Sequence, residues 1–171
     1  IDLEKTSKIC TGKYIYFLSS DDLLVKGALN KIINLTKSNN TVYLFNRIIC
    51  DKKLKEKKRP LWVSKKLDKK IFKFNSRENL REYISNSYSI GSLFSYMSCI
   101  VVKNKAYRKS KIIDNFIGTN YLHVQKILSL LFKSNYTLEY SNNHLVFFRG
   151  DNDSFKKNGY LNRIIIDFYG Y

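Results

Sequence analysis

The sequence predicts an α/β fold, in which a mixed β-sheet is flanked by helices, on three observations. Short apolar runs of strand length alternate with segments whose apolar residues recur every three or four positions, as on one face of a helix. Hydrophobic residues make up 44% and aromatic residues 15% of the chain, which excludes a disordered basic tail. Its 171 residues suit one unit covering residues 1–171 rather than two domains.

The first fifty residues predict a β-α-β order. Residues 3–10 have the pattern of the last turns of a helix, which Gly12 would end, with nothing before it to pack against. The continuous apolar run at 14–18 predicts a strand buried on both faces of a sheet. A helix begins near Val25, and residues 41–50 form the next strand after a polar turn.

The later elements follow from the same patterns. We expect a strand at 71–74, a helix from Ser76 as N-cap, a Ser/Gly-rich turn at 87–92 and a buried strand at 97–102. A helix at about 119–133 precedes two strands, 136–140 and 145–148, which flank a turn at Asn142 and Asn143. Apolar residues at helical spacing predict a final amphipathic helix: Leu161, Ile164, Ile165 and Phe168.

The chain is strongly basic. It carries 31 Lys and Arg against 14 Asp and Glu, a net charge of +17. Ten of these bases lie in residues 51–70 against three acids, which predicts an exposed basic insertion. Its lysines, with Trp62, could contact an anionic membrane, or the segment could be a solvated loop. We predict no nucleic-acid partner, because no helix-turn-helix, zinc-finger or RNP-like pattern accompanies the charge.

Cysteine usage and hydropathy place the chain inside the cell. The three cysteines, Cys10, Cys50 and Cys99, are widely spaced and odd in number, which is not typical of a disulfide framework. No apolar run approaches the length of a membrane span, and the N-terminus lacks the pattern of a secretory signal. The prediction is a cytoplasmic protein, with a peripheral position at the inner face of the membrane as an option.

An acidic pair, Asp21 and Asp22, follows the predicted strand at 14–18 and precedes the first full helix. The carboxyl ends of strands in α/β sheets are where ligands bind. Two carboxylates there can hold Mg²⁺ or Mn²⁺, which in turn can bridge a diphosphate. The alternative is that residues 19–22 only cap the helix, because Ser and Asp accept hydrogen bonds from free amides.

Three segments together resemble one family. Gly12, the strand at 14–18, Asp21-Asp22 and then Gly27-Ala28-Leu29 resemble the metal-site segment of family 2 glycosyltransferases of the GT-A fold. Residues 116–124 and 148–155 are similar to segments of the abequosyltransferase-like branch of that family. The three patches occur in the family's order along the chain.

The resemblance implies a GT-A-like sheet and an enzyme that moves a sugar from a nucleotide-sugar donor to a glycan or lipid-linked glycan acceptor. It implies bacterial surface polysaccharide or lipopolysaccharide synthesis, and an inverting reaction. The family's opening strand and its Asp-Asp-Gly-type loop are not recognisable. We therefore expect only the C-terminal part of the domain, lacking the nucleotide-binding βαβ half, with an incomplete donor site.

The resemblance also assigns the site residues. The family's Asp-x-Asp would place a carboxylate at Ser19, so that the Mn²⁺ or Mg²⁺ ion would rest mainly on Asp22, with Asp21 as a second ligand or a nucleotide contact. The family's usual Glu-Asp pair near the late helix is absent. Its place as catalytic base falls to His123 or to its rival Asp114, although His123 could instead be a structural helix residue and Asp114 a loop carboxylate.

Arg149 is the predicted phosphate contact, because it ends an apolar strand and begins a polar loop. It could instead pair with Asp151 or Asp153, which we expect to form a turn rather than a cation loop. His144 is predicted to be structural. The competing function is a non-catalytic basic module that binds anionic membrane or nucleic acid.

Overall fold

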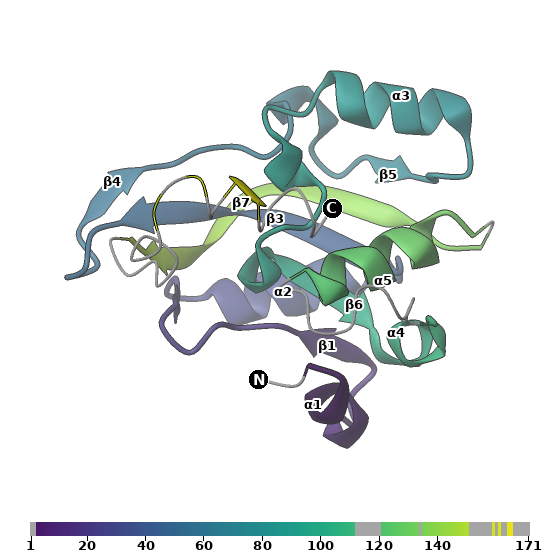
Figure 1. Cartoon of the computed structure of the whole chain (residues 1–171), viewed down its shortest axis with the longest axis horizontal. Coiled ribbons are helices and arrows are strands. Elements are labelled where there is room, and N and C mark those ends of the chain that lie inside the picture. Colours follow the sequence, from purple (N-terminus) through teal and green to yellow (C-terminus); the bar gives the residue numbers. More distant parts are fainter. Residues whose placement is uncertain are drawn as a thin grey trace.

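The computed structural model describes residues 3–111, 121–133, 135–150, 159, 161, 164 and 165. Within them the strands form one mixed sheet in the order β1-β6-β3-β7-β2 (Figure 1). The bounds of these strands are β1 Tyr14–Tyr16, β6 Ile100–Lys103, β3 Val42–Cys50, β7 Leu138–Arg149 and β2 Leu23–Leu24. Two short strands join the sides, β4 (Glu56–Lys58) against β3 and β5 (Ile71–Phe72) against β7. Only β3 and β7 pair in parallel among the described strands.

Helices cover both faces of this sheet. Figure 1 shows α5 (Leu122–Leu131) in front of the strands and α2 (Ala28–Thr36) behind them. The helix α3 (Arg77–Ser85) lies with β5 at one edge, and α1 (Leu3–Ile9) lies near α4 (Asn104–Lys109) at the other. Short 3-10 turns are present at Lys65–Leu67, Ile90–Ser92 and Met97–Cys99. The expectation of a mixed sheet flanked by helices is confirmed.

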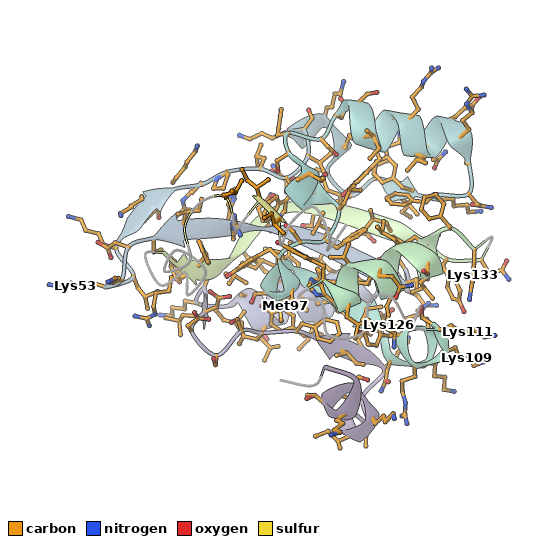
Figure 2. The ribbon with its side chains drawn as sticks, viewed as in Figure 1. Lys53, Met97, Lys109, Lys111, Lys126 and Lys133 are labelled. Carbon is orange, nitrogen blue, oxygen red and sulfur yellow. The ribbon has the colours of Figure 1, made fainter. Side chains whose placement is uncertain are left out.

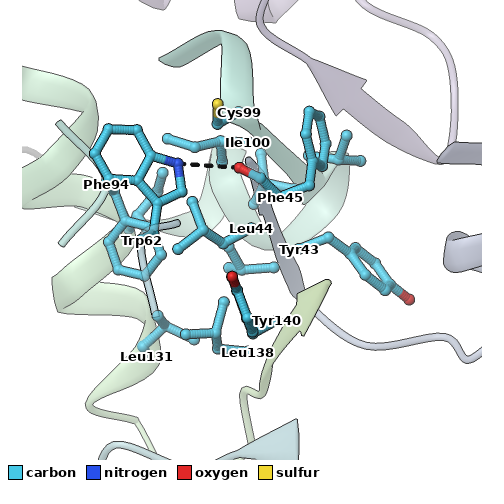
Figure 3. Close-up of a cluster of buried hydrophobic side chains, with 14 of the residues drawn as sticks. Tyr43, Leu44, Phe45, Trp62, Phe94, Cys99, Ile100, Leu131, Leu138 and Tyr140 are labelled. Carbon is cyan, nitrogen blue, oxygen red and sulfur yellow. Dashed lines mark hydrogen bonds between the residues drawn. The ribbon is translucent and has the colours of Figure 1, made fainter. Parts of the chain in front are cut away.

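The core centres on β3, whose first four residues are all buried because helices cover both sides of the strand. Trp62 packs against this centre and donates from Nε1 to the carbonyl oxygen of Phe45 at 3.1 Å (Figure 3). Gly91 allows this packing, since a Cβ there would lie 2.5 Å from the Trp62 ring. The indole therefore fills the space between the sheet and the segment around residue 91.

The first strand differs from its prediction. Only residues 14–16 of the apolar run pair, antiparallel to β6, and β1 stands at one end of the strand order. Ile15 is buried, but Tyr14 and Tyr16 are half-buried, so the expected burial on both faces is wrong. The reason is the phenol groups, which reach polar partners: Tyr14 donates to the Asn40 carbonyl at 3.2 Å and Tyr16 to the Ser98 carbonyl at 3.0 Å.

The two strands predicted around Asn142 and Asn143 are one strand, β7. Its parallel pairing with β3 runs through both halves, with Leu44 opposite Tyr140 and Asn46 opposite His144. Three residues of β7 therefore face one residue of β3, which is a bulge rather than a turn. The Ser141 hydroxyl accepts from the Asn143 side chain at 2.8 Å and stabilises this bulge.

The N-terminal helix is held by an element that follows it in the chain. The helix α1 packs against α4, an element that the sequence did not reveal, and Ser7 is buried. The Asn104 amide at the start of α4 donates to the carbonyls of Cys10 and Gly12, both at 2.8 Å. These bonds hold the segment that enters β1.

The basic segment at 51–70 is partly built into the fold. The chain turns back at Asp51, whose carboxylate accepts from the amides of Lys53 and Lys55 at 2.8 and 2.9 Å, and β4 extends the sheet beyond β3. Trp62, Val63 and Leu67 are buried, whereas the lysines of the hairpin are exposed. Trp62 therefore does not face a membrane together with those lysines.

The remaining predictions can be compared directly. The elements β3, α3 and α5 lie where they were expected, whereas α2 begins at Ala28 and not near Val25. Ser76 caps α3 by accepting from the Asn79 amide at 3.4 Å. The three cysteines are free. In the part of the chain that the structure describes, no helix is long and apolar enough to cross a membrane. Of the predicted final helix, Leu161, Ile164 and Ile165 are helical and exposed, and Phe168 lies outside the described residues.

Candidate active site

Asp22 is held in place by two hydroxyl groups from a distant segment. Tyr96 donates to its Oδ2, and the Ser98 hydroxyl donates to the same oxygen at 2.6 Å. Ser98 also accepts from the Ser19 amide at 3.0 Å, so that it ties together both ends of the loop at 19–22. Burial raises the pKa of Asp22, and the two hydroxyl donors oppose this effect by stabilising the carboxylate.

Asp21 lies beside Asp22 with a different partner. The Ser19 hydroxyl donates to Asp21 Oδ1 at 2.5 Å. Ser19, which stands where the family's motif has a carboxylate, therefore hydrogen-bonds to the carboxylate of Asp21. The helix-capping alternative is wrong, because α2 begins at Ala28 after Gly27, which has a φ of 76° and gives no side-chain cap. The acidic pair instead precedes β2, whose pairing with β7 fixes its position.

Arg149 ends β7 next to the acidic loop. Its Nε donates to the Asp21 carbonyl oxygen at 3.1 Å and its terminal nitrogen to the Lys52 carbonyl at 2.7 Å. Gly150 follows, and a Cβ there would lie 2.3 Å from the Cys50 carbonyl oxygen, so only glycine lets β7 end this close to β3. The guanidinium is thus placed beside the acidic pair, and its predicted phosphate contact stays a prediction.

Arg47 is the residue that sequence reasoning missed. It lies on β3, and its guanidinium carbon is 4.6 Å from the Trp62 ring, 4.4 Å from the Tyr96 ring and 4.7 Å from the Phe148 ring. We call these three rings the aromatic cage. Tyr96 therefore contacts Arg47 with its ring and Asp22 with its hydroxyl. The available signal was the polar pair Asn46-Arg47 inside a buried strand.

His123 lies in the core on α5, with 3% of its surface exposed. Its Nε2 is 3.0 Å from the carbonyl oxygen of Phe94, and burial lowers its pKa to about 4. Phe94 has a φ of 71°, a strained value for an aromatic residue, and its carbonyl bond to His123 helps to hold that conformation. His123 thus supports the segment that carries Tyr96 and Ser98 to Asp22.

Other predicted residues are separate from this cluster or cannot be placed. Asp114, Asp151 and Asp153 lie outside the described residues. His144 Nε2 is 3.0 Å from the Pro60 carbonyl oxygen, a structural contact that holds the chain after β4.

The donor set fits a divalent metal that is completed by substrate and water. Among the described residues, no three His, Cys, Asp or Glu side chains converge on one point. Mg²⁺ is nevertheless commonly bound by one or two carboxylates together with phosphate oxygens and waters. Asp21 and Asp22 supply two such carboxylates, and Asp22 is held rigidly by its hydroxyl donors.

Comparison with known proteins assigns the family. Residues 3–115 match the sequence profile described as Glycosyl transferase family 2. The chain belongs to this family. The chain is also 34% identical over 163 residues to "Abequosyltransferase RfbV" of Salmonella typhimurium, an alignment that covers 95% of this chain and 49% of that protein. The chain thus spans about half the length of the curated relative that it matches.

These matches correct the expectation that this member of glycosyl transferase family 2 lacks the N-terminal half of the domain. The family profile begins to match at residue 3, so the prediction that the chain holds only a C-terminal part of the domain, without the N-terminal half, is wrong. The prediction gave too much weight to the missing opening motifs. The matched range includes both carboxylates of the acidic pair and also Arg47, Tyr96 and Ser98.

Proposed function

We propose that this chain carries the catalytic site of a glycosyltransferase that moves a sugar from a nucleotide-sugar donor to a glycan or lipid-linked glycan of the bacterial surface, with inversion. The observation that carries the proposal is the Asp21-Asp22 pair, held by Tyr96 and Ser98 with Arg149 alongside. The similarity to an abequosyltransferase supports a surface-glycan acceptor. The corresponding place of action is the cytoplasm, at the inner face of the membrane.

The residues of the chain have separate tasks in this reaction. A Mn²⁺ or Mg²⁺ ion held by Asp22 and Asp21 would neutralise the charge of the departing diphosphate. Asp22 keeps its position through two hydroxyl bonds, which leaves little reorganisation for the reacting state. We assign to Arg149 the donation to phosphate oxygens, through the part of its guanidinium that does not bind carbonyls.

The catalytic base must remove the proton from the acceptor hydroxyl as the anomeric carbon is attacked. A base needs hydrogen-bond access to the acceptor, and His123 is buried with its Nε2 at the Phe94 carbonyl. Its pKa of about 4 also makes it a weak proton acceptor. We therefore favour Asp114 as the base and assign His123 a supporting position.

Metal removal tests the proposal. Purified chain is incubated with a panel of nucleotide sugars and lipid-linked glycan from bacterial membranes, and released nucleoside diphosphate is measured. We expect turnover in Mn²⁺ or Mg²⁺ and its loss in a chelator, because uncompensated diphosphate charge raises the barrier by several kcal/mol, roughly 100-fold or more in rate. Re-addition of Mn²⁺ should restore turnover. No metal-dependent transfer from any donor would contradict the proposal.

The β3–β4 hairpin is the proposed membrane contact. Figure 2 shows Lys53 at the far tip of the molecule, at the end opposite Lys109, Lys111 and Lys133. The hairpin carries further exposed lysines at 52, 55, 57 and 58. Each basic residue near an anionic surface contributes about 1 kcal/mol of binding free energy, so together they would hold the chain where a lipid-linked acceptor is presented.

Charge removal tests this contact. We expect the Lys→Gln change at all five hairpin lysines to weaken binding to phosphatidylglycerol vesicles by about 100-fold or more in a sedimentation assay. The matched control removes five exposed lysines elsewhere: Lys26, Lys31, Lys37, Lys105 and Lys111. An equal loss in both variants would mean that the whole basic surface, and not the hairpin, attracts the membrane. Unchanged binding in the hairpin variant would exclude the contact.

A further inference from the structure

One nitrogen of the Arg47 guanidinium, Nε, is buried and has no hydrogen-bond partner in the described protein. The guanidinium lies within the aromatic cage at 4.4–4.7 Å from all three rings. It forms no ion pair with another described residue. The face of an aromatic ring attracts a cation electrostatically. It does not replace the hydrogen bonds that oxygen acceptors would form with the N–H groups of the guanidinium.

Such an arrangement is costly unless something else supplies oxygen acceptors. A buried N–H group normally has an acceptor, because its removal from water is not repaid by ring contacts alone. The cage at the same time fixes the fork in one orientation, so little side-chain entropy remains to be lost on binding. A planar, fixed guanidinium is suited to a bidentate bond with an oxyanion.

The position of Arg47 indicates which oxyanion. Tyr96 bridges the two groups, with its ring on Arg47 and its hydroxyl on Asp22. Phe148, another wall of the cage, is adjacent in sequence to Arg149 and packs on Tyr96 with the ring centroids 5.1 Å apart. An anion at Arg47 would therefore lie beside the acidic pair, where a metal ion would hold a diphosphate.

We propose that Arg47, fixed by Trp62, Tyr96 and Phe148, binds a phosphate oxyanion of the substrate beside Asp22. This inference rests on the proposed function, because it assigns a substrate contact at the same site. The phosphate belongs either to the diphosphate of the nucleotide-sugar donor or to the phosphate group of a lipid-linked acceptor.

The cage supplies its own reporter. Trp62 is the only tryptophan of the chain, and its ring lies on the Arg47 guanidinium, so an anion that engages Arg47 should alter Trp62 emission. The probe is inorganic pyrophosphate, titrated in a chelator so that metal plays no part. Calorimetry gives the affinity independently of the tryptophan.

The variants separate charge, fork and fold. We expect Arg47→Met to weaken pyrophosphate binding by about tenfold or more, and Arg47→Lys to give an intermediate loss because it keeps the charge without the fork. The matched control is Arg81→Gln, an exposed arginine on α3, which should bind as the unmodified chain does. Thermal melting shows which variants are folded. If Arg47→Met does not fold, the pyrophosphate affinity of Arg47→Lys tests the inference.

Each outcome bears on the inference. Pyrophosphate binding that is unchanged in folded Arg47 variants, or absent in the unmodified chain, overturns it. Where binding depends on Arg47, stronger competition by nucleoside diphosphates assigns the donor, and stronger competition by farnesyl diphosphate assigns the lipid acceptor.

The proposed function is tested separately. Asp22→Asn should lower transfer by about 100-fold or more. It should not weaken metal-free pyrophosphate binding, because it removes a negative charge near the anion. Arg47-dependent binding in a chain without any transfer activity would contradict the proposed function and leave the anion site standing. If transfer requires Asp22 but pyrophosphate binding does not depend on Arg47, the proposed function stands and the anion site at Arg47 is contradicted.

Discussion

Replacing Asp22 by Asn is expected to lower glycosyl transfer by about 100-fold or more. The amide keeps the shape of the carboxylate, and its oxygen can still accept from Tyr96 and Ser98. The variant therefore removes the charge that we propose binds the metal, while the loop at 19–22 keeps its anchor. Because a divalent metal contributes several kcal/mol to charge stabilisation, we expect loss of its proposed main ligand to have an effect of this size. The measurement is turnover at saturating donor as the Mn²⁺ concentration is raised.

The same change should not destabilise the fold. Burial raises the pKa of Asp22 above that of an unfolded aspartate, so the ionised carboxylate costs folding free energy at neutral pH. A neutral Asn removes that cost, and the unfolding free energy should stay the same or rise. Asp51→Asn is the matched control, since the Asp51 carboxylate also accepts two hydrogen bonds, here from backbone amides, but lies in the β3–β4 turn. Full metal-dependent turnover in the Asp22 variant would refute the site.

Asp21→Asn separates the two carboxylates. Asp21 accepts from the Ser19 hydroxyl, and in the proposed site Asp22 is the main metal ligand. We expect a smaller loss of turnover, with a rise in the Mn²⁺ concentration that gives half of the maximal rate. Equal losses in the two variants would mean that both carboxylates bind the metal equally.

The sequence predicted the acidic pair but not its environment, and the reason is physical. Local spacing shows that Asp21 and Asp22 lie between an apolar run and a helix, and a family motif can be matched on those residues alone. The partners Tyr96 and Ser98 are 74 and 76 residues away in the chain. Only the packing of the 3-10 turn Met97–Cys99 beside β1 brings them to the loop, and no local pattern encodes that contact.

The strand predictions failed where polar atoms, and not apolar residues, decide the geometry. The apolar run at 14–18 resembled a fully buried strand, but its tyrosine hydroxyls need polar partners at one side of the sheet. Asn142 and Asn143 are typical turn residues, yet the pairing of β7 with β3 absorbs them in a bulge. The helices α2, α3 and α5 were predictable because their apolar spacing or their cap is local.

His123 is expected to make the fold sensitive to acid. Its pKa is about 4 in the folded chain because burial disfavours the charged ring, against about 6.5 for an unfolded histidine. The unfolded chain therefore takes up a proton first as the pH falls. The stability contributed by the neutral ring is fully present above pH ~6.5 and decreases progressively toward pH ~4. The loss amounts to about 3 kcal/mol once the pH is below both values.

Urea unfolding between pH 7 and pH 4.5 measures this effect against a non-titrating variant. His123→Gln keeps an N–H that can donate to the Phe94 carbonyl, so the segment leading to Tyr96 should hold its place. We expect the unfolding free energy of this variant to fall less steeply with acid than that of the unmodified chain. His144→Gln is the control, because His144 is only partly buried and its pKa is lowered less.

The outcome also bears on catalysis. A buried, neutral His123 whose removal flattens the acid dependence of stability, with turnover retained in His123→Gln, is a structural support for the strained turn at Phe94. A catalytic base would behave differently, because turnover would collapse in His123→Gln at every pH while stability changed little. The comparison of the two readouts therefore separates the roles that the sequence left open for this residue, and Asp114→Asn under the same assay tests the rival base.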